Sequence, residues 1–522
     1  MSIRRNVLFG LMTVLVALPL LPACTSLPDN SRRASSLAIE DGERTGLGRA
    51  FQPLLENHSG QSGVFLLGNG LDAFVGRAML ARLAERSIDL QYYMFHQDTV
   101  GRLLIKQLLA AADRGVRVRM LIDDMYGEEA DAVWSALDAH PQIEVRLFNP
   151  FVRGRSKNLQ FITRMKTVNH RMHSKTYTVD NQASIVGGRN IGDEYFAANK
   201  ELAFADLDVM AIGPVVREVS QEFDQYWNSE HAYPVAALTA AAKAGALETL
   251  RNDLAAFSRE KVTSAYIDAL EHSPLAQSLK NKSVRFSFAD AKVLHDAPEK
   301  MTKGDGWKAE LLMSQLAPYI QQATEEFVLV SPYFVPGQRG ADALCGLSKK
   351  GVRVRVLTNS LASNDVSAVH AGYKRHRIQL LRCGVQLYEL NEQIKKQEGE
   401  RFTWLPGLSK SSLHAKTMAI DKKMMFVGSF NFDPRSLYIN NEIGILFSEP
   451  QLAANASAHF DAHVERVAFR VELVGDEKGG GSLRWTGTED GKTVVFNSEP
   501  YVGFWKKLGV NLIRILPIDS ML

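Results

Sequence analysis

Two twenty-residue segments of the chain, 171–190 and 412–431, carry the same sparse pattern of chemically active residues. Each reads His-x-Lys, then four residues, Asp, six residues, Gly, two residues and Asn. With each residue type at roughly 2–7% of average usage, a chance match is on the order of 10⁻⁷ per starting point. Two matches therefore indicate function. The shared positions are His173, Lys175, Asp180, Gly187 and Asn190 in one copy and His414, Lys416, Asp421, Gly428 and Asn431 in the other.

Each copy offers one imidazole, one ammonium and one carboxamide, a set of groups that suits a phosphate. Side chains two residues apart on a strand share a face, so the His and the Lys of each motif point together. The motif glycine lets backbone approach this patch closely, and the asparagine adds its amide. Asp180 and Asp421 belong to the candidate catalytic signature, but each begins a tight turn, which favours a structural role for both.

Two such half-sites, facing each other, could hold one phosphorus between two imidazoles. One neutral histidine can attack the phosphorus in line as a nucleophile. The other, protonated, can give its proton to the leaving alkoxide. The lysines and amides stabilise the charge that builds on the oxygens. A phosphohistidine forms, and an alcohol or water then removes it. We expect this chemistry to need no metal and no organic cofactor.

The elements that must position the two motifs are duplicated as well. The sequence GVRVR begins at Gly115 and again at Gly351, 236 residues apart, and the motif histidines are 241 residues apart. An apolar, β-branched run and a segment of helical periodicity precede each GVRVR, a pattern typical of strand, helix, strand. We expect an α/β fold of two lobes related by a pseudo-twofold axis. Each lobe is predicted to be a mostly parallel sheet flanked by helices, with the active site between the lobes.

The N-terminal residues differ in kind from the rest. A basic start, a short apolar run and the string LPAC at Leu21–Cys24 resemble a lipoprotein signal in which Cys24 is lipidated. An uncleaved N-terminal anchor is the alternative. The expected division of the chain is signal peptide 1–23, polar tether 24–59, lobe one 60–235, helical connector 236–284, lobe two 285–475 and C-terminal extension 476–522.

Charge and cysteine content restrict the remaining possibilities. The net charge of +3 is too small to indicate a nucleic-acid partner by itself. Only Cys345 and Cys383 follow Cys24, and two cysteines do not make a disulfide framework. No spacing of His and Cys residues suggests a zinc site. Six basic residues crowd the approach to the first motif, where either a solvated loop or a site for anionic headgroups is consistent with them: Arg153, Arg155, Lys157, Arg164, Lys166 and Arg171.

The doubled motif resembles that of the phospholipase D superfamily. Stretches such as GSFNFDPRSLYINNE and the C-terminal LPIDSML are similar to its bacterial cardiolipin synthase C-like branch. The resemblance implies that His173 is the nucleophile and His414 the general acid, and that the lysines, with Asn190 and Asn431, bind the phosphate. It also implies a carboxylate that orients each imidazole. We expect Glu442 to serve His414 and Asp206 to serve His173, with Glu201 and Asp208 as alternatives to Asp206.

The resemblance further implies transfer of a phosphatidyl group to phosphatidylglycerol, which makes cardiolipin. The donor is left open, with phosphatidylethanolamine as one candidate, and so is a protein partner. The lipoprotein signal places the enzyme on the periplasmic side of a bacterial cell envelope, on an unspecified membrane. Hydrolysis of phospholipids is the first alternative, and a nucleic-acid phosphodiesterase or an inactive scaffold is less favoured. The tail from Tyr501 either packs on lobe two or lies at a membrane interface, and packing is favoured.

Overall fold

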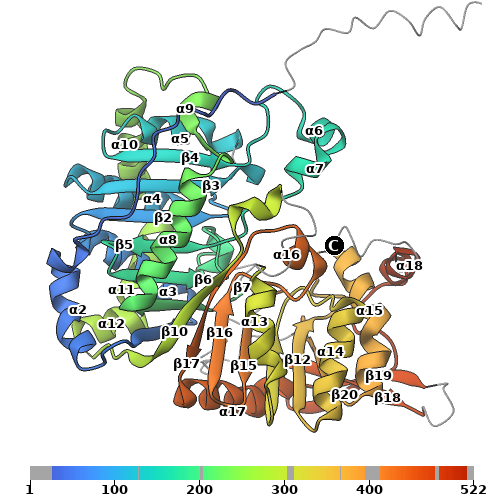
Figure 1. The fold of residues 1–522 in the computed structure, drawn as a ribbon. Coiled ribbons are helices and arrows are strands. Elements are labelled where there is room, and N and C mark those ends of the chain that lie inside the picture. The colour runs from blue at the N-terminus through green and yellow to red at the C-terminus, as the bar shows by residue number, and fades with distance from the viewer. Residues whose placement is uncertain are drawn as a thin grey trace, which may run out of the picture.

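The computed structural model describes residues 26–126, 128–199, 204–281, 283–302, 311–364, 366–393, 412–475 and 481–513. Cys24, the predicted signal peptide and Glu201 lie outside these ranges. Two α/β lobes lie side by side, one blue to green and the other yellow to red (Figure 1). Within the described ranges, no helix combines the length and apolar character that crossing a bilayer requires.

Lobe one is built on a sheet in the order β9-β4-β3-β2-β5-β6-β8-β1. Strands β2, β3 and β4 are parallel, because helices return the chain to the same edge between them. The motif itself forms the hairpin β5–β6. The strands are β1 (Ser62–Leu67), β2 (Ser87–Tyr92), β3 (Arg117–Asp123), β4 (Ile143–Phe148), β5 (Thr176–Val179), β6 (Ala183–Gly187), β7 (Phe204–Ala205), β8 (Asp208–Ile212) and β9 (Ala232–Pro234).

Lobe two repeats this order as β13-β12-β11-β15-β16-β17-β10, with the second motif in the hairpin β15–β16. The C-terminal extension adds β19 and β20 beside β18 at the outer edge. The strands are β10 (Ser287–His295), β11 (Glu326–Val330), β12 (Arg353–Asn359), β13 (Gln386–Leu390), β14 (Ser412–Leu413), β15 (Thr417–Ile420), β16 (Met424–Gly428), β17 (Ile443–Ser448), β18 (Ala468–Val474), β19 (Ser482–Glu489) and β20 (Lys492–Phe496).

Helices flank both sheets and fill the expected connector. The α-helices are α2 (Gly46–Glu56), α3 (Gly70–Leu83), α4 (Thr99–Asp113), α5 (Asp131–Asp138), α6 (Lys157–Thr163), α7 (Met165–Val168), α8 (Pro214–Asn228), α9 (Val235–Leu238), α10 (Ala246–Phe257), α11 (Lys261–Glu271), α12 (Pro274–Lys280), α13 (Leu312–Gln321), α14 (Gly337–Lys349), α15 (Ser367–Arg382), α16 (Pro434–Tyr438), α17 (Pro450–Val467) and α18 (Phe504–Ile513). Short 3₁₀ turns are η1 (Gly42–Arg44), η2 (Asp124–Tyr126), η3 (Glu128–Ala130), η4 (Asp193–Tyr195) and η5 (Pro298–Met301).

The α/β class and the duplicated lobes are confirmed, but the prediction of mostly parallel sheets is wrong. Among the described residues, only β2–β3–β4 and β11–β12–β13 run parallel in the two main sheets. The remaining pairings are antiparallel, since each motif is a hairpin and the next strand turns back beside it. The short strands β7 and β14 also pair in parallel, and they belong to different lobes.

The two lobes form one body. Strand β10 pairs with β1 of lobe one through its first residues and with β17 of lobe two through its last ones, so the sheets are continuous. A single cluster of buried apolar side chains then joins both lobes. It includes Val215 and Val219 from α8, together with Ala456, Phe460 and Val464 from α17. This shared core fixes the position of one motif relative to the other.

The segment expected to be a polar tether is instead packed against lobe one. Asn30 donates its side-chain amide to the carbonyl of Ala232 at 2.9 Å. The indole nitrogen of Trp227 donates to the hydroxyl of Ser36 at 2.9 Å. Helix α2 then follows, with Thr45 capping its N-terminus. The chain is therefore held from Asn30 onward, because buried polar groups of lobe one find their partners in it.

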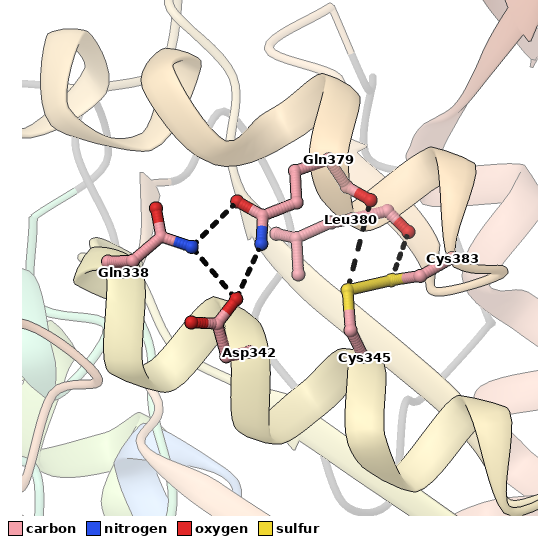
Figure 2. The surroundings of a disulfide bond; sticks show 6 residues. All are labelled: Gln338, Asp342, Cys345, Gln379, Leu380 and Cys383. Atoms are coloured by element: carbon pink, nitrogen blue, oxygen red, sulfur yellow. Dashed lines mark hydrogen bonds between the residues drawn. A yellow bond between two sulfur atoms is a disulfide. The ribbon is translucent and has the colours of Figure 1, made fainter.

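A disulfide joins Cys345 on α14 to Cys383 just after α15 (Figure 2), although two cysteines did not suggest one in the sequence. The same pair of helices is also joined by the side chain of Gln379, which donates to Asp342 at 2.8 Å. Disulfides persist in oxidising compartments such as the periplasm.

Reduction of this disulfide is expected to lower the free energy of unfolding by about 2–4 kcal/mol, because it closes a loop with a sequence separation of 38 residues. Denaturant unfolding with and without dithiothreitol measures the change, and the double variant Cys345→Ser, Cys383→Ser serves as the control that reductant should no longer affect. An unfolding midpoint that reductant leaves unchanged in the unsubstituted protein would contradict the prediction.

Candidate active site

Both motif histidines lie at the boundary between the lobes, in extended segments that lead into β5 and β15. The backbone of each segment is held by the opposite lobe. The amide of His173 donates to the carbonyl of Asn441 at 2.8 Å, and the amide of His414 donates to the carbonyl of Ala205 at 2.8 Å. The short pairing of β14 with β7 supports the second contact. The two half-sites therefore meet, as the duplicated pattern predicted.

The carboxylates that orient the imidazoles are exchanged between the lobes. Nδ1 of His173 lies 2.9 Å from Oε2 of Glu442, and Nδ1 of His414 lies 2.6 Å from Oδ2 of Asp206. Both acids are fully buried. The expected pairing within each lobe is wrong, because the backbone contacts to Asn441 and Ala205 bring the neighbouring acid of the other lobe under each ring.

This arrangement fixes the tautomer of each histidine. With Nδ1–H donated to a carboxylate, Nε2 is the nitrogen left to carry a lone pair or a transferable proton. Glu442 is held further by hydroxyl groups that the sequence did not single out, since Ser429 donates to its Oε2 at 2.5 Å and Ser436 donates to its Oε1 at 2.7 Å. Lobe one has Gly188 where lobe two has Ser429, and a Cβ there would lie 2.2 Å from Asp206.

The site is buried and contains ionisable groups of both signs, since Lys175 and Lys416 lie with Asp206 and Glu442. Burial lowers the pKa of His173 to about 4, although the charge of Glu442 opposes the shift. Burial and the ammonium of Lys416 lower the pKa of His414 to about 3. Burial likewise lowers the pKa of Lys175 to about 7. Neutral imidazoles are therefore favoured near neutral pH, and the neutral form is the one that a nucleophile requires.

The lysines are satisfied locally in this ligand-free arrangement. Nζ of Lys175 donates to the carbonyl of His173 at 2.5 Å, and Nζ of Lys416 donates to the carbonyl of His414. Nζ of Lys416 also lies 2.8 Å from Nδ1 of His414. Each ammonium group therefore lies beside its own histidine, as the spacing of two residues predicted.

Aromatic rings line both histidines. The ring of Tyr93 meets His173 edge-on with centroids 5.0 Å apart, and the ring of Tyr195 meets His414 in the same way at 5.1 Å. Tyr195 had not been singled out, although it follows the first motif by only five residues. Apolar walls of this kind exclude water and strengthen the electrostatic interactions within the site.

The two motif asparagines differ in their partners. The amide nitrogen of Asn190 donates to the hydroxyl of Tyr195 at 2.9 Å, while its oxygen accepts from the amide of Met94. This places Asn190 one side chain away from the ring of His414. The backbone amide of Asn431 donates to the hydroxyl of Ser436, and among the described residues its buried side-chain oxygen has no hydrogen-bond partner. A phosphate-binding role for both remains a prediction.

Asp180 and Asp421 do not reach the histidines, which corrects their place in the candidate catalytic set. The carboxylate of Asp180 accepts from the backbone amides of Glu85, Arg86 and Ser87, at the start of β2. Asp421 accepts in the same way at the start of β11 from residues 324–326. Both adopt positive φ at the hairpin turn. They anchor the motif hairpins, which agrees with the structural role that the turn favoured.

Asp208, an alternative partner for His173, is instead paired with Arg77 at 2.9 Å inside lobe one. Glu201, the other alternative, lies outside the described residues. Arg153 pairs with Asp124, and Arg171 pairs with Asp123, so two of the six basic residues before the first motif hold the fold.

One cluster of three potential metal ligands, His370, Glu389 and Glu499, occurs among the described residues. The guanidinium of Arg377 bonds both carboxylates, so an ion pair occupies this position.

The chain is similar to proteins of one family. The domain described as "Cardiolipin synthase, PLD-like domain" matches residues 79–227 and 316–464. The chain is 40% identical to cardiolipin synthase C of Escherichia coli (strain K12) over 476 residues, which cover 91% of this chain and 99% of that one. It is 26% identical to cardiolipin synthase A of Pseudomonas syringae pv. syringae (strain B728a), over 78% of this chain and 69% of that one.

A solved structure shares the fold. The phosphatidylserine synthase of Haemophilus influenzae Rd KW20 superposes with a TM-score of 0.56 at 13% identity, over 91% of this chain and all of that one. Because the identity is low, this likeness bears on the arrangement of the two lobes. Both matched domain segments contain one complete motif, so the comparison agrees with the duplication.

Proposed function

The chain belongs to the phospholipase D superfamily, within its cardiolipin synthase-like branch, and from that premise we propose that it makes cardiolipin by transferring a phosphatidyl group to phosphatidylglycerol. The observation that carries the proposal is the pair of imidazole–carboxylate contacts, Glu442 to His173 and Asp206 to His414, each made across the lobe boundary. These contacts orient both histidines at the lobe boundary, and they support the proposal that the two act on one phosphorus.

In the proposed mechanism, Nε2 of His173 attacks the phosphorus of the donor lipid. The P–O bond to the headgroup breaks, and His414, protonated at Nε2, gives its proton to the leaving alkoxide. The phosphatidyl group is then bound to His173. Neutral His414 next takes the proton of a hydroxyl of phosphatidylglycerol, whose oxygen displaces His173. Lys175 and Lys416 stabilise the negative charge on the phosphoryl oxygens throughout both steps.

Substrate binding must alter the protonation of this site. The free site contains two lysines beside the imidazoles, and their charges help to hold the pKa of His414 near 3. A bound phosphodiester brings a negative charge, which favours the protonated forms of histidine and lysine. The general acid is therefore formed together with the substrate complex.

Binding of dimethyl phosphate, a soluble anionic diester, is expected to take up protons at pH 8. Lys175, with a pKa of about 7, is mostly neutral there in the free site, and the anion raises this pKa. Lys175 should contribute about one proton per site to this uptake, in addition to the proton taken up by His414. Isothermal titration calorimetry in buffers of different ionisation enthalpy measures the uptake. Lys175→Met should lower the uptake by about one proton at this pH, and an uptake that this variant leaves unchanged, or proton release on binding, would contradict the assignment.

We further propose that the mature chain is a lipoprotein anchored through Cys24 and facing the periplasm. The LPAC string supports the anchor, and the Cys345–Cys383 disulfide is consistent with an oxidising compartment. Lipidation on Cys24 would hold the enzyme at the bilayer that contains its substrates.

Lipid mass spectrometry tests the activity. Purified protein is incubated with vesicles of phosphatidylglycerol and phosphatidylethanolamine, one of which carries an isotope label. Cardiolipin should form, and the presence or absence of the label in it identifies the donor. Phosphatidic acid without cardiolipin would indicate hydrolysis by water. No change in any lipid would overturn the proposed substrate class. Activity is expected to survive exhaustive treatment with EDTA.

A further inference from the structure

Helices α6 and α7, between β4 and the first motif, expose large apolar side chains. Leu159 is 49% exposed, Ile162 is 78% exposed and Met165 is 45% exposed. Leu159 and Ile162 are three residues apart on α6, the spacing of neighbours on one side of a helix, and Met165 begins α7 two residues after α6 ends. In Figure 1, α6 and α7 stand out from the body of lobe one. We call residues 155–168 the α6–α7 platform.

The platform is also basic. The segment 151–171 contains six Lys and Arg residues and no Asp or Glu. Arg153 and Arg171, which form ion pairs with buried carboxylates, lie outside the platform. The platform itself carries the other four, Arg155, Lys157, Arg164 and Lys166. Apolar side chains flanked by basic residues, without acidic ones, match the interface of a membrane that contains anionic lipids.

The platform lies at the rim of the candidate active site. Arg435 of α16 in lobe two donates to the side-chain oxygen of Asn169 at 2.9 Å and to its carbonyl at 2.6 Å. His170 is bonded to the carbonyl of Ile439. The catalytic His173 follows only three residues later. The end of α7 is therefore fixed to lobe two beside the motif, so a lipid held at the platform would be close to the site.

The N-terminal segment reaches the body of the protein on the same side. Asn30 bonds the carbonyls of Glu230 and Ala232, and the next residue, Tyr233, interacts electrostatically with Arg164 of the platform. Five residues separate Cys24 from Asn30. Even fully extended, this stretch spans only about 20 Å. A lipid on Cys24 would thus keep the platform near the bilayer.

We propose that the α6–α7 platform docks on the anionic membrane, with Leu159, Ile162 and Met165 in the interface and the basic residues at the headgroups. The docked platform presents the site between the lobes to lipids in the same leaflet. This inference rests on the proposed function for its substrate, but the membrane contact itself can be measured without turnover.

The contact is tested with an environment-sensitive fluorophore on Ile162→Cys in the full chain. Val262→Cys on α11 is the matched control, because Val262 is 77% exposed and Ile162 is 78% exposed. The labelled protein is mixed with vesicles of phosphatidylcholine and phosphatidylglycerol that have brominated acyl chains. The probe at 162 should be quenched at least twofold, and the probe at 262 should not. Equal quenching at both positions would overturn the proposal, and so would the absence of quenching at position 162.

Kinetics provide a second test. Ile162→Asp should lower the rate on phosphatidylglycerol vesicles at least fivefold more than the rate on the same headgroup in dispersed short-chain lipid. Val262→Asp should leave the ratio of these rates unchanged. An unchanged ratio for Ile162→Asp would overturn docking. If the unsubstituted protein turns over no lipid in either form, the proposed function fails. The quenching result still decides whether the platform contacts the membrane.

Discussion

Replacing His173 with alanine is expected to lower cardiolipin formation by on the order of 10⁴-fold or more, because the variant loses the atom that becomes bonded to phosphorus. The imidazole of His173 is oriented by Glu442 at 2.9 Å and held neutral by burial, so no other group at this position can replace it. Water admitted to the space of the lost ring is a poor substitute. Lipid mass spectrometry on purified protein gives the rate.

The control is His272→Ala, which removes an exposed histidine at the end of α11. It should keep the activity of the unsubstituted protein, and circular dichroism should show that both variants are folded. Quenching in denaturing detergent at alkaline pH, where the P–N bond of a phosphohistidine survives, provides a direct readout of the intermediate when the donor lipid is radiolabelled at phosphorus. Label should be trapped on the unsubstituted protein and not on His173→Ala. Label that persists in His173→Ala and disappears in His414→Ala would reverse the two roles.

The residues of the site could be predicted from the sequence because chemistry requires particular side chains at particular spacings. His173 and His414 with their lysines meet at one boundary, as the duplicated pattern indicated. The partners of the histidines could not be predicted in the same way. Glu442 follows His414 by 28 residues, so chain distance favoured a pairing within one lobe. The backbone contacts of His173 with Asn441 and of His414 with Ala205 decide otherwise, and they exist only after the lobes pack.

The other differences between the predicted and the observed fold also arise from contacts that form only when distant elements pack together. A parallel sheet follows from strand–helix–strand units, and those units do occur at β2–β3–β4. The tight turn within each motif was also expected, but the antiparallel strands on either side of it join the same sheet, so most strand pairs of that sheet are antiparallel. Cys345 lies on α14 and Cys383 just after α15, and only the packing of these two helices brings the sulfur atoms together. Contacts between elements distant in sequence leave no local pattern.

The crossed pairing predicts that two isosteric substitutions will affect different chemical steps. Glu442→Gln leaves His173 without an anionic partner, so it should impair attack on phosphorus. Asp206→Asn does the same to His414, so it should impair protonation of the leaving group. Each variant is expected to lose roughly 10²–10⁴-fold in activity on natural lipids, since an amide also favours the wrong tautomer.

A donor whose leaving group needs no proton separates the two effects. With a p-nitrophenyl ester of phosphatidic acid, the first turnover no longer depends on a general acid. The burst of nitrophenolate should therefore return to within about tenfold of the unsubstituted protein in Asp206→Asn. In Glu442→Gln it should stay slow, because His173 still has to attack. Pairing within each lobe would give the opposite result, with the burst restored in Glu442→Gln. Since Asp206 and Glu442 are both fully buried and each contacts Nδ1 of one histidine, a merely structural effect of either substitution would slow the bursts of both variants.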